Sequence, residues 1–216
     1  MSLHQISQML DAILMTFRVH IEARIAALIG KGFYTIGPCG EETMAAVAHA
    51  LHEKDTLALH YRHLGTSICR HLVDGSSMEQ ILLNRARGYT VSRLDPVTGG
   101  VHCALGGSQN QYLVTSTLAS QCPAAVGRAL GLKQKAVSFV TIGDGSVHNA
   151  HFWSAFHLAR FAKHQNLKCP VIFGISDNGL SISYSTKHYV ETLFDHDPLI
   201  PIFRANGSDV LDVYSQ

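Results

Sequence analysis

The spacing of apolar positions predicts helices through the first part of the chain. Apolar residues recur every three or four positions from the N-terminus, which is the period of a helix with one buried face. They are Ile6, Leu10, Ile13, Phe17, Ile21, Ile25 and Leu28. Gly30 and Gly32 are expected to end this helix. Further helices are predicted over 41–52, 63–73 and 77–86, with a short strand over 57–60.

The second half of the chain alternates between strands and helices. Continuous apolar runs over 136–142 and 170–176 predict two buried strands, and helices are predicted over 121–132 and 150–164. Uninterrupted apolar strands joined by a helix are typical of a parallel sheet with helices on both faces. The sequence therefore predicts an α/β fold.

The last residues are expected to form a strand over 200–207 and the start of a helix over 208–216. That pattern stops in mid-fold, so we expect one domain over 1–216 that is truncated at its C-terminus. Residues 88–111 are rich in glycine, serine and proline and show no period. A loop of that length in a compact domain points towards function.

Composition excludes several classes of function. The formal net charge of +1 gives no basic field for nucleic acid. No apolar run reaches the roughly 18–20 residues of a membrane span, and the N-terminus lacks the layout of a signal peptide. The five scattered cysteines predict buried, reduced thiols in a cytoplasmic (bacterial) or mitochondrial-matrix-like compartment. The 14 histidines show no zinc-motif spacing. Three of them, His63, His148 and His151, are interpreted as polar residues on helix surfaces.

The most informative motif is Gly143-Asp144-Gly145, at the end of the first long apolar strand. In a parallel sheet that position opens into the ligand crevice, and glycines let the backbone approach a ligand. The N-terminus of a following helix favours a diphosphate. Because the Asp144 carboxylate would repel a diphosphate, we expect Mg²⁺ between them. Asn178, after the next strand, offers a second oxygen ligand.

Other interpretations of these residues stay open at this point. One alternative is that Asp144 caps the next helix, and Asn178-Gly179 is a common turn dipeptide. A nicotinamide-binding domain would use a glycine turn and an acid such as Asp177. However, the third glycine is missing, and Asp177 lies 32 residues after Gly145 rather than roughly 20. A non-catalytic interaction module of the same fold is a further alternative.

Several segments together resemble the α subunits of 2-oxoacid dehydrogenases, in their thiamine diphosphate-dependent decarboxylating component. The resemblance spans about residues 10–214, and its segments are Phe33-Tyr34, Gly40-Glu41-Glu42, HYRHLG (60–65), STLASQCPAAVGRALG (116–131), GDG (143–145) and DNGLSIS (177–183). It implies the transketolase-like, thiamine diphosphate-binding fold. The Gly-Glu-Glu segment favours a branched-chain substrate such as 2-oxoisovalerate over pyruvate.

The resemblance also implies roles for individual residues. Mg²⁺ would be bound by Asp144, the Asn178 side chain and the Leu180 carbonyl. The cofactor would be bound by Tyr61 and Arg62 at its diphosphate, by Ser116 and Leu118 at its middle, and by the backbone of Gly143, Gly145 and Ser146. His102 matches a loop near the active site and is a candidate catalytic residue.

The implied reaction is oxidative decarboxylation of a small 2-oxoacid, with acyl transfer to a lipoyl-bearing acyltransferase. The activating glutamate would come from a β subunit or fused β domain, so the isolated chain is expected to be inactive. We expect a dimer or an α₂β₂ assembly that binds neither nucleic acid nor membrane. The chain departs from the family pattern at His148-Asn149, at Asp177 and in an insertion over 163–168.

Overall fold

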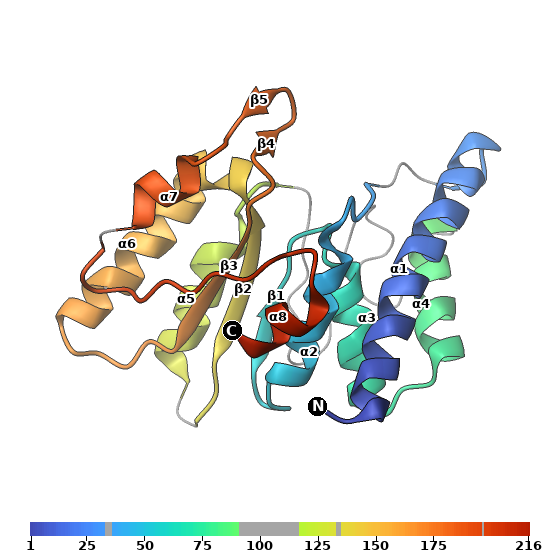
Figure 1. Cartoon of the computed structure of the whole chain (residues 1–216), viewed down its shortest axis with the longest axis horizontal. Helices are drawn as coiled ribbons and strands as arrows, with labels where there is room; N and C mark the ends of the chain where they lie inside the picture. Colours follow the sequence, from blue (N-terminus) through green and yellow to red (C-terminus); the bar gives the residue numbers. More distant parts are fainter. Residues whose placement is uncertain (33–35, 91–116, 133–134, 196) are drawn as a thin grey trace.

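A three-stranded parallel sheet lies at the centre of the α/β fold, as predicted. The computed structural model describes residues 1–32, 36–90, 117–132, 135–195 and 197–216. The strands run in the order β1 (Thr56–Ala58), β2 (Ser138–Gly143) and β3 (Val171–Ser176), so the middle strand is the one that leads into the glycine motif. Figure 1 shows this sheet between two groups of helices.

Helices cover both faces of the sheet because successive strand residues point to opposite sides. Leu57 and Phe139 are register partners, and both belong to the core cluster formed with the N-terminal helices. The next pair, Ala58 and Val140, belongs to the second cluster, with helices α5 (Gln121–Gly131) and α6 (Ala150–His164). The predicted parallel sheet with helices on both faces is therefore confirmed.

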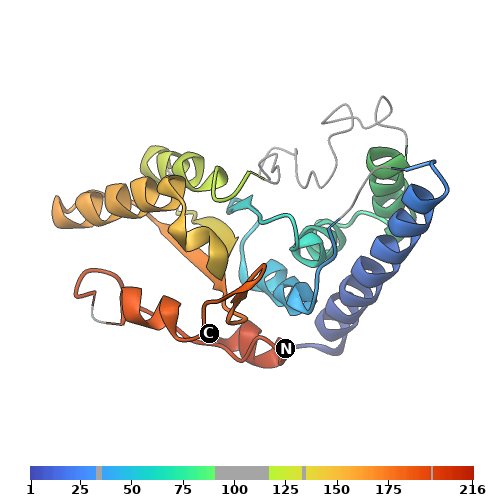
Figure 2. The ribbon, with the colours of Figure 1, turned by 90° about the horizontal axis from the view of Figure 1, so that it is seen from above.

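The N-terminal half is a helical layer. Its elements are α1 (Leu3–Leu28), the 3₁₀ helix η1 (Glu41–Ala46), α2 (Val47–Ala50), α3 (Leu64–Val73) and α4 (Met78–Thr90). Helix α1 packs against α3, α4 and η1, and Figure 2 shows α1 and α4 at the opposite end of the molecule from α6. Close packing requires a glycine at Gly65, where a Cβ atom would lie 3.3 Å from Thr16 Oγ1.

The chain after β3 forms a small hairpin and then returns to the N-terminal half. Strands β4 (Leu180–Ser181) and β5 (Tyr184–Ser185) pair antiparallel, and α7 (Tyr189–Phe194) follows. The last helix, α8 (Val210–Ser215), packs against η1. The Thr43 hydroxyl donates to the Gly207 carbonyl over 2.6 Å, so the C-terminal segment is tied to the helical layer.

Some predicted boundaries are wrong, and the causes are local. The segment 200–207 is not a strand: Ile200 is half-buried and 201–207 are exposed. Asn206 N donates to Asp212 Oδ2 over 2.6 Å rather than to a neighbouring strand. The helix predicted over 41–52 is a 3₁₀ turn followed by one α-helical turn. Residues 88–90 belong to α4 rather than to a loop, and 91–111 lie outside the described residues.

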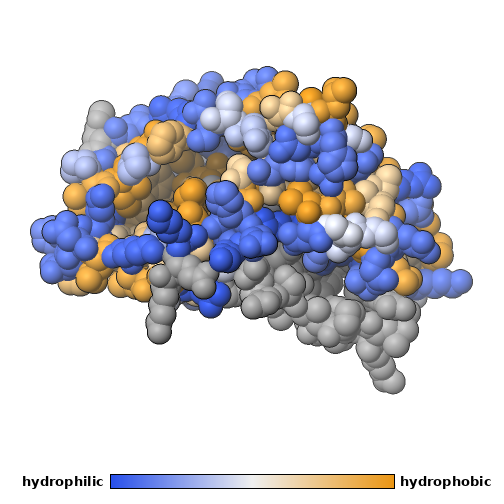
Figure 3. Space-filling model, turned by 90° about the horizontal axis from the view of Figure 1, so that it is seen from below, coloured by the Kyte–Doolittle hydropathy of each residue, from blue (hydrophilic) through white to orange (hydrophobic). Residues whose placement is uncertain are grey.

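Large apolar side chains are exposed on several elements. They include Leu3, Leu28, Ile182, Tyr184 and Phe203. Figure 3 shows hydrophobic residues gathered among hydrophilic ones on the face seen from below, some of them inside a hollow. Extended apolar surface of this kind often marks a place where another protein binds. None of the described helices is long and apolar enough to cross a lipid bilayer.

Candidate functional site

The glycine motif lies at the carboxyl edge of the sheet, where two strands end together. Gly143 is the last residue of β2 and is the register partner of Ser176, the last residue of β3. The segments that begin with Asp144 and Asp177 therefore leave the sheet side by side. The prediction that both segments follow adjacent strand ends is confirmed.

A 3₁₀ helix, rather than an α-helix, follows the first glycine. This element, η3, covers Asp144–His148, and α6 begins only after Asn149. Asn149 is the N-cap of α6, because its side chain accepts a hydrogen bond from His151 N over 2.9 Å. The helix predicted over 150–164 is therefore confirmed, and a short 3₁₀ turn lies between it and the glycine motif.

Asp144 is a buried carboxylate held by neutral donors. The residue is only 4% exposed. Its Oδ1 accepts from Gly145 N over 2.7 Å, and its Oδ2 accepts from the Thr186 hydroxyl. It does not cap α6, so that alternative is wrong. No ion pair joins Asp144 to a cationic side chain among the described residues.

A buried charge without a counter-charge is costly, and each carboxylate oxygen here retains lone-pair capacity. This donor set therefore fits a hard divalent cation such as Mg²⁺, which prefers oxygen ligands.

Asn178 lies in the turn that joins β3 to the hairpin, and Leu180 is the first residue of β4. Asn178 is exposed, and its Oδ1 accepts a hydrogen bond from Leu180 N over 2.9 Å. Gly179 has a φ of +72°, a conformation that favours glycine. The turn interpretation of Asn178-Gly179 is therefore confirmed. The metal-binding roles of Asn178 and Leu180 stay predictions, compatible with that turn because an amide oxygen has a second lone pair.

The β4–β5 hairpin closes over the glycine turn. A Cβ atom at Gly145 would lie 2.9 Å from Ser181 Cβ, and so no larger residue fits without movement. Ser146, the next residue, is buried. Both Ser181 and Thr186, the donor to Asp144, come from the hairpin region. Sequence reasoning missed them because these contacts join segments about 40 residues apart, without a local pattern.

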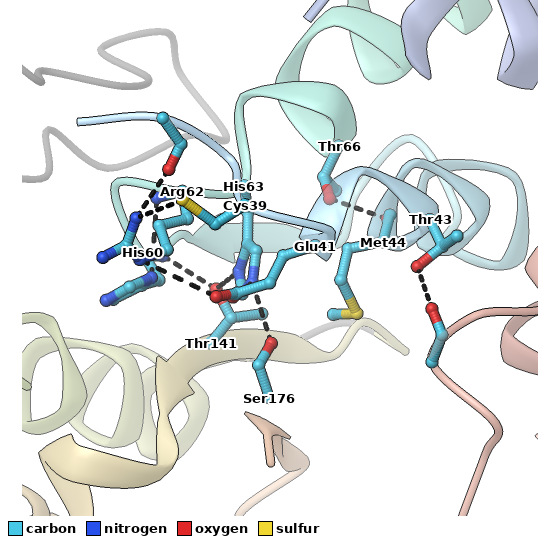
Figure 4. Close-up of polar contacts among 12 residues, drawn as sticks. Cys39, Glu41, Thr43, Met44, His60, Arg62, His63, Thr66, Thr141 and Ser176 are labelled. Carbon is cyan, nitrogen blue, oxygen red and sulfur yellow. Dashed lines mark hydrogen bonds and ion pairs between the residues drawn. The ribbon is translucent and has the colours of Figure 1, made fainter. Parts of the chain in front are cut away.

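Arg62 is held by four neighbours rather than extended into solvent. Its Nη1 donates to the Gly37 carbonyl over 2.6 Å and lies 3.3 Å from Cys39 Sγ. Its Nε lies 3.7 Å from Glu41 Oε1, and its guanidinium carbon lies 5.4 Å from the centre of the Tyr61 ring. Figure 4 shows this side chain beside Cys39 and His60. These contacts give the predicted diphosphate-binding cation a fixed position.

A second polar cluster surrounds His63, which we had interpreted as a helix-surface residue. That interpretation is wrong, because His63 is fully buried. Its Nδ1 lies 2.6 Å from Thr141 Oγ1, and its Nε2 lies 2.7 Å from Glu41 Oε2 and 3.0 Å from Ser176 Oγ. Thr141 Oγ1 also accepts from His60 N over 2.7 Å. The cluster thus joins η1, both long strands and the start of α3 (Figure 4).

The charge states in this cluster follow from burial and from the hydrogen bonds. Burial raises the pKa of Glu41, but the hydrogen bond and charge of His63 outweigh it, so that this pKa is lowered overall. Burial, and then the charge of His63, lower the pKa of His60 to about 3. At neutral pH, Glu41 is therefore ionised and His60 is neutral.

The remaining candidate residues have no contact with Asp144 or Arg62 among the hydrogen bonds and ion pairs described above, or they lie outside the described residues. His102, Ser116 and the Phe33-Tyr34 segment fall outside them. Leu118 precedes α5 and is 39% exposed. His148 is exposed and stacks on Tyr189, with ring centres 4.6 Å apart.

The described cysteines confirm the prediction of reduced thiols, because Cys39, Cys69, Cys122 and Cys169 are all free. Of these four, Cys69 and Cys122 are buried and Cys169 is half-buried, and Cys103 lies outside the described residues. The prediction of burial is wrong for Cys39, which is exposed beside Arg62.

The sequence of the chain matches a known protein family. Residues 9–216 match the family described as the dehydrogenase E1 component. The 2-oxoisovalerate dehydrogenase subunit alpha of Caenorhabditis elegans is 28% identical over 191 residues, which are 85% of this chain and 42% of that protein. A second relative, the 2-oxoisovalerate dehydrogenase subunit alpha 2 of Arabidopsis thaliana, is 29% identical over 188 residues, or 82% of this chain and 37% of that protein.

A third relative is named for a different substrate, pyruvate. The pyruvate dehydrogenase E1 component subunit alpha of Saccharomyces cerevisiae is 25% identical over 194 residues, which are 85% of this chain and 42% of that protein. All three relatives are named as mitochondrial. The chain spans about two fifths of the length of these relatives.

Proposed function

The chain belongs to the family of dehydrogenase E1 components, and on that premise we propose that it binds thiamine diphosphate and Mg²⁺ as the α-type part of a 2-oxoacid dehydrogenase. The observation that carries the proposal is Asp144, a buried carboxylate beside a glycine turn, with only neutral donors bonded to it among the described residues. The fold of the complete protein would be of the transketolase-like, thiamine diphosphate-binding type.

Asp144, the Asn178 side chain and the Leu180 carbonyl would hold the metal. The position of Asp144 after β2 and of Asn178 after β3 supports this set, because adjacent parallel strands end at the same edge. Asp177 is exposed and its Oδ1 accepts from Gly179 N over 3.2 Å. One carboxylate oxygen of Asp177 is therefore hydrogen-bonded within the turn of residues 177–179.

Tyr61 and Arg62 would hold the diphosphate. Guanidinium groups suit this role through their charge and forked donors, and the Gly37 carbonyl and Glu41 fix the group in place. The backbone of Gly143, Gly145 and Ser146 would line the cofactor site, and Leu118 and Ser116 would contact the middle of the cofactor. His102 remains the candidate catalytic residue of this chain.

Bound thiamine diphosphate would supply the electron sink for decarboxylation of a small 2-oxoacid. The chain's own residues would bind and orient the cofactor by charge and hydrogen bonds. Two named relatives act on 2-oxoisovalerate and one on pyruvate. The Gly40-Glu41-Glu42 segment favours the branched-chain substrate.

The proposed partners are a β subunit or fused β domain and a lipoyl-bearing acyltransferase that receives the acyl group. Exposed apolar residues such as Ile182 and Phe203 support a protein partner, and a dimer or an α₂β₂ assembly would cover this surface. A mitochondrial-matrix-like or bacterial cytoplasmic location agrees with the reduced cysteines.

Titration calorimetry of thiamine diphosphate into the chain, with and without Mg²⁺, tests the proposal. We expect Mg²⁺-dependent binding that Asp144→Ala abolishes and no binding of NAD, which serves as the control ligand. Binding should become tighter when a β partner is added, if the site is completed at an interface. Absence of binding both alone and with the partner would instead identify a non-catalytic interaction module.

A further inference from the structure

We propose that Glu41, His60 and His63 form a binding site for a divalent transition-metal ion of the zinc class, separate from the site around Asp144. Each side chain offers one ligand atom, and the three atoms lie within 4.8 Å of one another. His60 is 4% exposed and His63 is fully buried, so the site lies inside the protein and not among surface histidines.

The ligand types select the class of metal. Two imidazole nitrogens and one carboxylate oxygen suit Zn²⁺, which binds this set in many enzymes with a fourth position left for water. Mg²⁺ prefers oxygen ligands throughout. The cluster should therefore discriminate against the Mg²⁺ expected at Asp144, where the donor groups are oxygens.

The contacts of His63 position it as a metal ligand. A ligating histidine usually donates its other ring N–H to a nearby oxygen, which fixes the ring orientation. In His63, Nδ1 lies 2.6 Å from Thr141 Oγ1, and Thr141 belongs to the central strand. Its Nε2 is thereby directed at Glu41 and Ser176.

The contact between His63 and Glu41 is one that a cation can replace. His63 Nε2 and Glu41 Oε2 lie 2.7 Å apart, and two such acceptor atoms require a proton between them. Metal binding displaces protons of this kind from its ligands. Because Glu41 has a lowered pKa, its carboxylate is available to a metal at neutral pH.

The imidazole ring of His60 makes few polar contacts with the described residues. The hydrogen bond that it accepts is a weak one, from Arg62 N to Nδ1 over 3.5 Å. No second hydrogen bond to the ring is found among the described residues, although the side chain is buried. Its lowered pKa, about 3, keeps the imidazole neutral and its lone pair available. The ring of this buried residue therefore has a lone pair that can bind a metal ion.

The geometry requires only small movements. Zinc bonds of about 2.1 Å in a tetrahedral site place ligand atoms roughly 3.4 Å apart. The ligand atoms here are separated by 2.7 Å for the His63–Glu41 pair and by at most 4.8 Å within the cluster. Side-chain shifts of roughly 1 Å would therefore close the site. Ser176 Oγ, 3.0 Å from His63 Nε2, can hydrogen-bond to a water in the fourth position.

Zinc titration of the metal-free chain tests the proposal without thiamine diphosphate. Affinity and stoichiometry are measured by competition with a chromophoric chelator, and Co²⁺ is added separately to report the coordination geometry by its visible absorption. We expect one tight Zn²⁺ per chain and a Co²⁺ spectrum of a four- or five-coordinate site. Glu41→Gln and His60→Gln should each weaken zinc binding at least tenfold.

Two variants serve as matched controls. His188→Gln removes a histidine whose Nδ1 lies 2.9 Å from Glu191 Oε2 on the surface, and it should leave zinc affinity unchanged. Asp144→Asn should also leave it unchanged, which separates this site from the proposed Mg²⁺ site. His63→Gln is included with circular dichroism, since a buried variant can fail to fold. Unchanged affinity in both Glu41→Gln and His60→Gln, or no tight zinc binding by the folded chain, would overturn the proposal.

Discussion

Gly143 and Ser176 are partners in the register of β2 and β3, and each is the last residue of its strand. This single pairing brings the Asp144 turn and the Asp177-Asn178 turn to one edge of the sheet. It also brings Ser176 within 3.0 Å of His63. The expected cofactor site and the histidine cluster therefore share one strand end.

Asp144→Asn should abolish the stabilisation of the chain by Mg²⁺ and thiamine diphosphate, with little effect on the fold. The amide oxygen can still accept from Gly145 N, and the buried charge is lost. In metal-free buffer, the free energy of unfolding should stay within about 1 kcal/mol of wild type. Urea unfolding measures this free energy with and without Mg²⁺ and thiamine diphosphate. Equal stabilisation of the variant and wild type by the added ligands would contradict the role given to Asp144.

Thr186→Val should destabilise the metal-free chain, because it leaves one oxygen of a buried carboxylate without its donor. Hydrogen bonds to charged groups contribute about 1.5–3 kcal/mol, and we expect a loss of that size in urea unfolding. Thr186→Ser keeps the hydroxyl and is the matched control. A loss in Thr186→Ser as large as that in Thr186→Val would show that the methyl group, and not the hydrogen bond, matters.

Gly145→Ala should disturb the closure of the hairpin over the turn, since the added Cβ would meet Ser181. Overpacking of this kind costs about 1–3 kcal/mol. In Gly127→Ala, the control within α5, the added Cβ meets nothing within 4 Å, and stability should rise by about 0.5–1 kcal/mol. Combining Gly145→Ala with Ser181→Gly should restore stability, and failure of this rescue would argue against the steric explanation.

Thiol modification should distinguish the exposed cysteine from the buried ones. Burial raises the pKa of Cys69 and of Cys122 to about 12, so both should resist alkylation of the folded chain at pH 8. Cys39 is exposed and should react. Peptide mass spectrometry gives the rate at each site. Bound thiamine diphosphate with Mg²⁺ should slow the reaction of Cys39, whose Sγ lies 3.3 Å from Arg62 Nη1. An unchanged rate of Cys39 modification would contradict the proposal that Arg62 binds the diphosphate.

The long helices were predictable because apolar residues recur along them with a helical period, and the two long strands because each is a continuous apolar run. The helix over 150–164 is found with the predicted limits, and the strand of 136–142 is found two residues later at its start. The strand predicted over 200–207 is wrong, because Ile202 and Phe203 are exposed rather than paired in a sheet. Hydrophobic pattern alone does not say whether a neighbouring strand exists.

Site residues were predictable only where a single segment of the sequence forms a recognisable motif. Asp144 could be found because it stands between two glycines after an apolar strand. The hydroxyl of Thr186 and the partners of His63 could not, since those contacts depend on tertiary structure. His63 was wrongly placed on a helix surface because the sequence around 60–65 shows no partner, whereas Glu41 and Ser176 reach it from η1 and β3.

Diffraction from crystals of the chain grown with thiamine diphosphate and Mn²⁺, recorded at the manganese absorption edge, tests the central claim most directly. The account predicts an anomalous peak about 2.1–2.2 Å from a carboxylate oxygen of Asp144 and from Asn178 Oδ1, with the diphosphate beside Arg62. A peak elsewhere with no peak at Asp144, or bound cofactor without metal at Asp144, would contradict it.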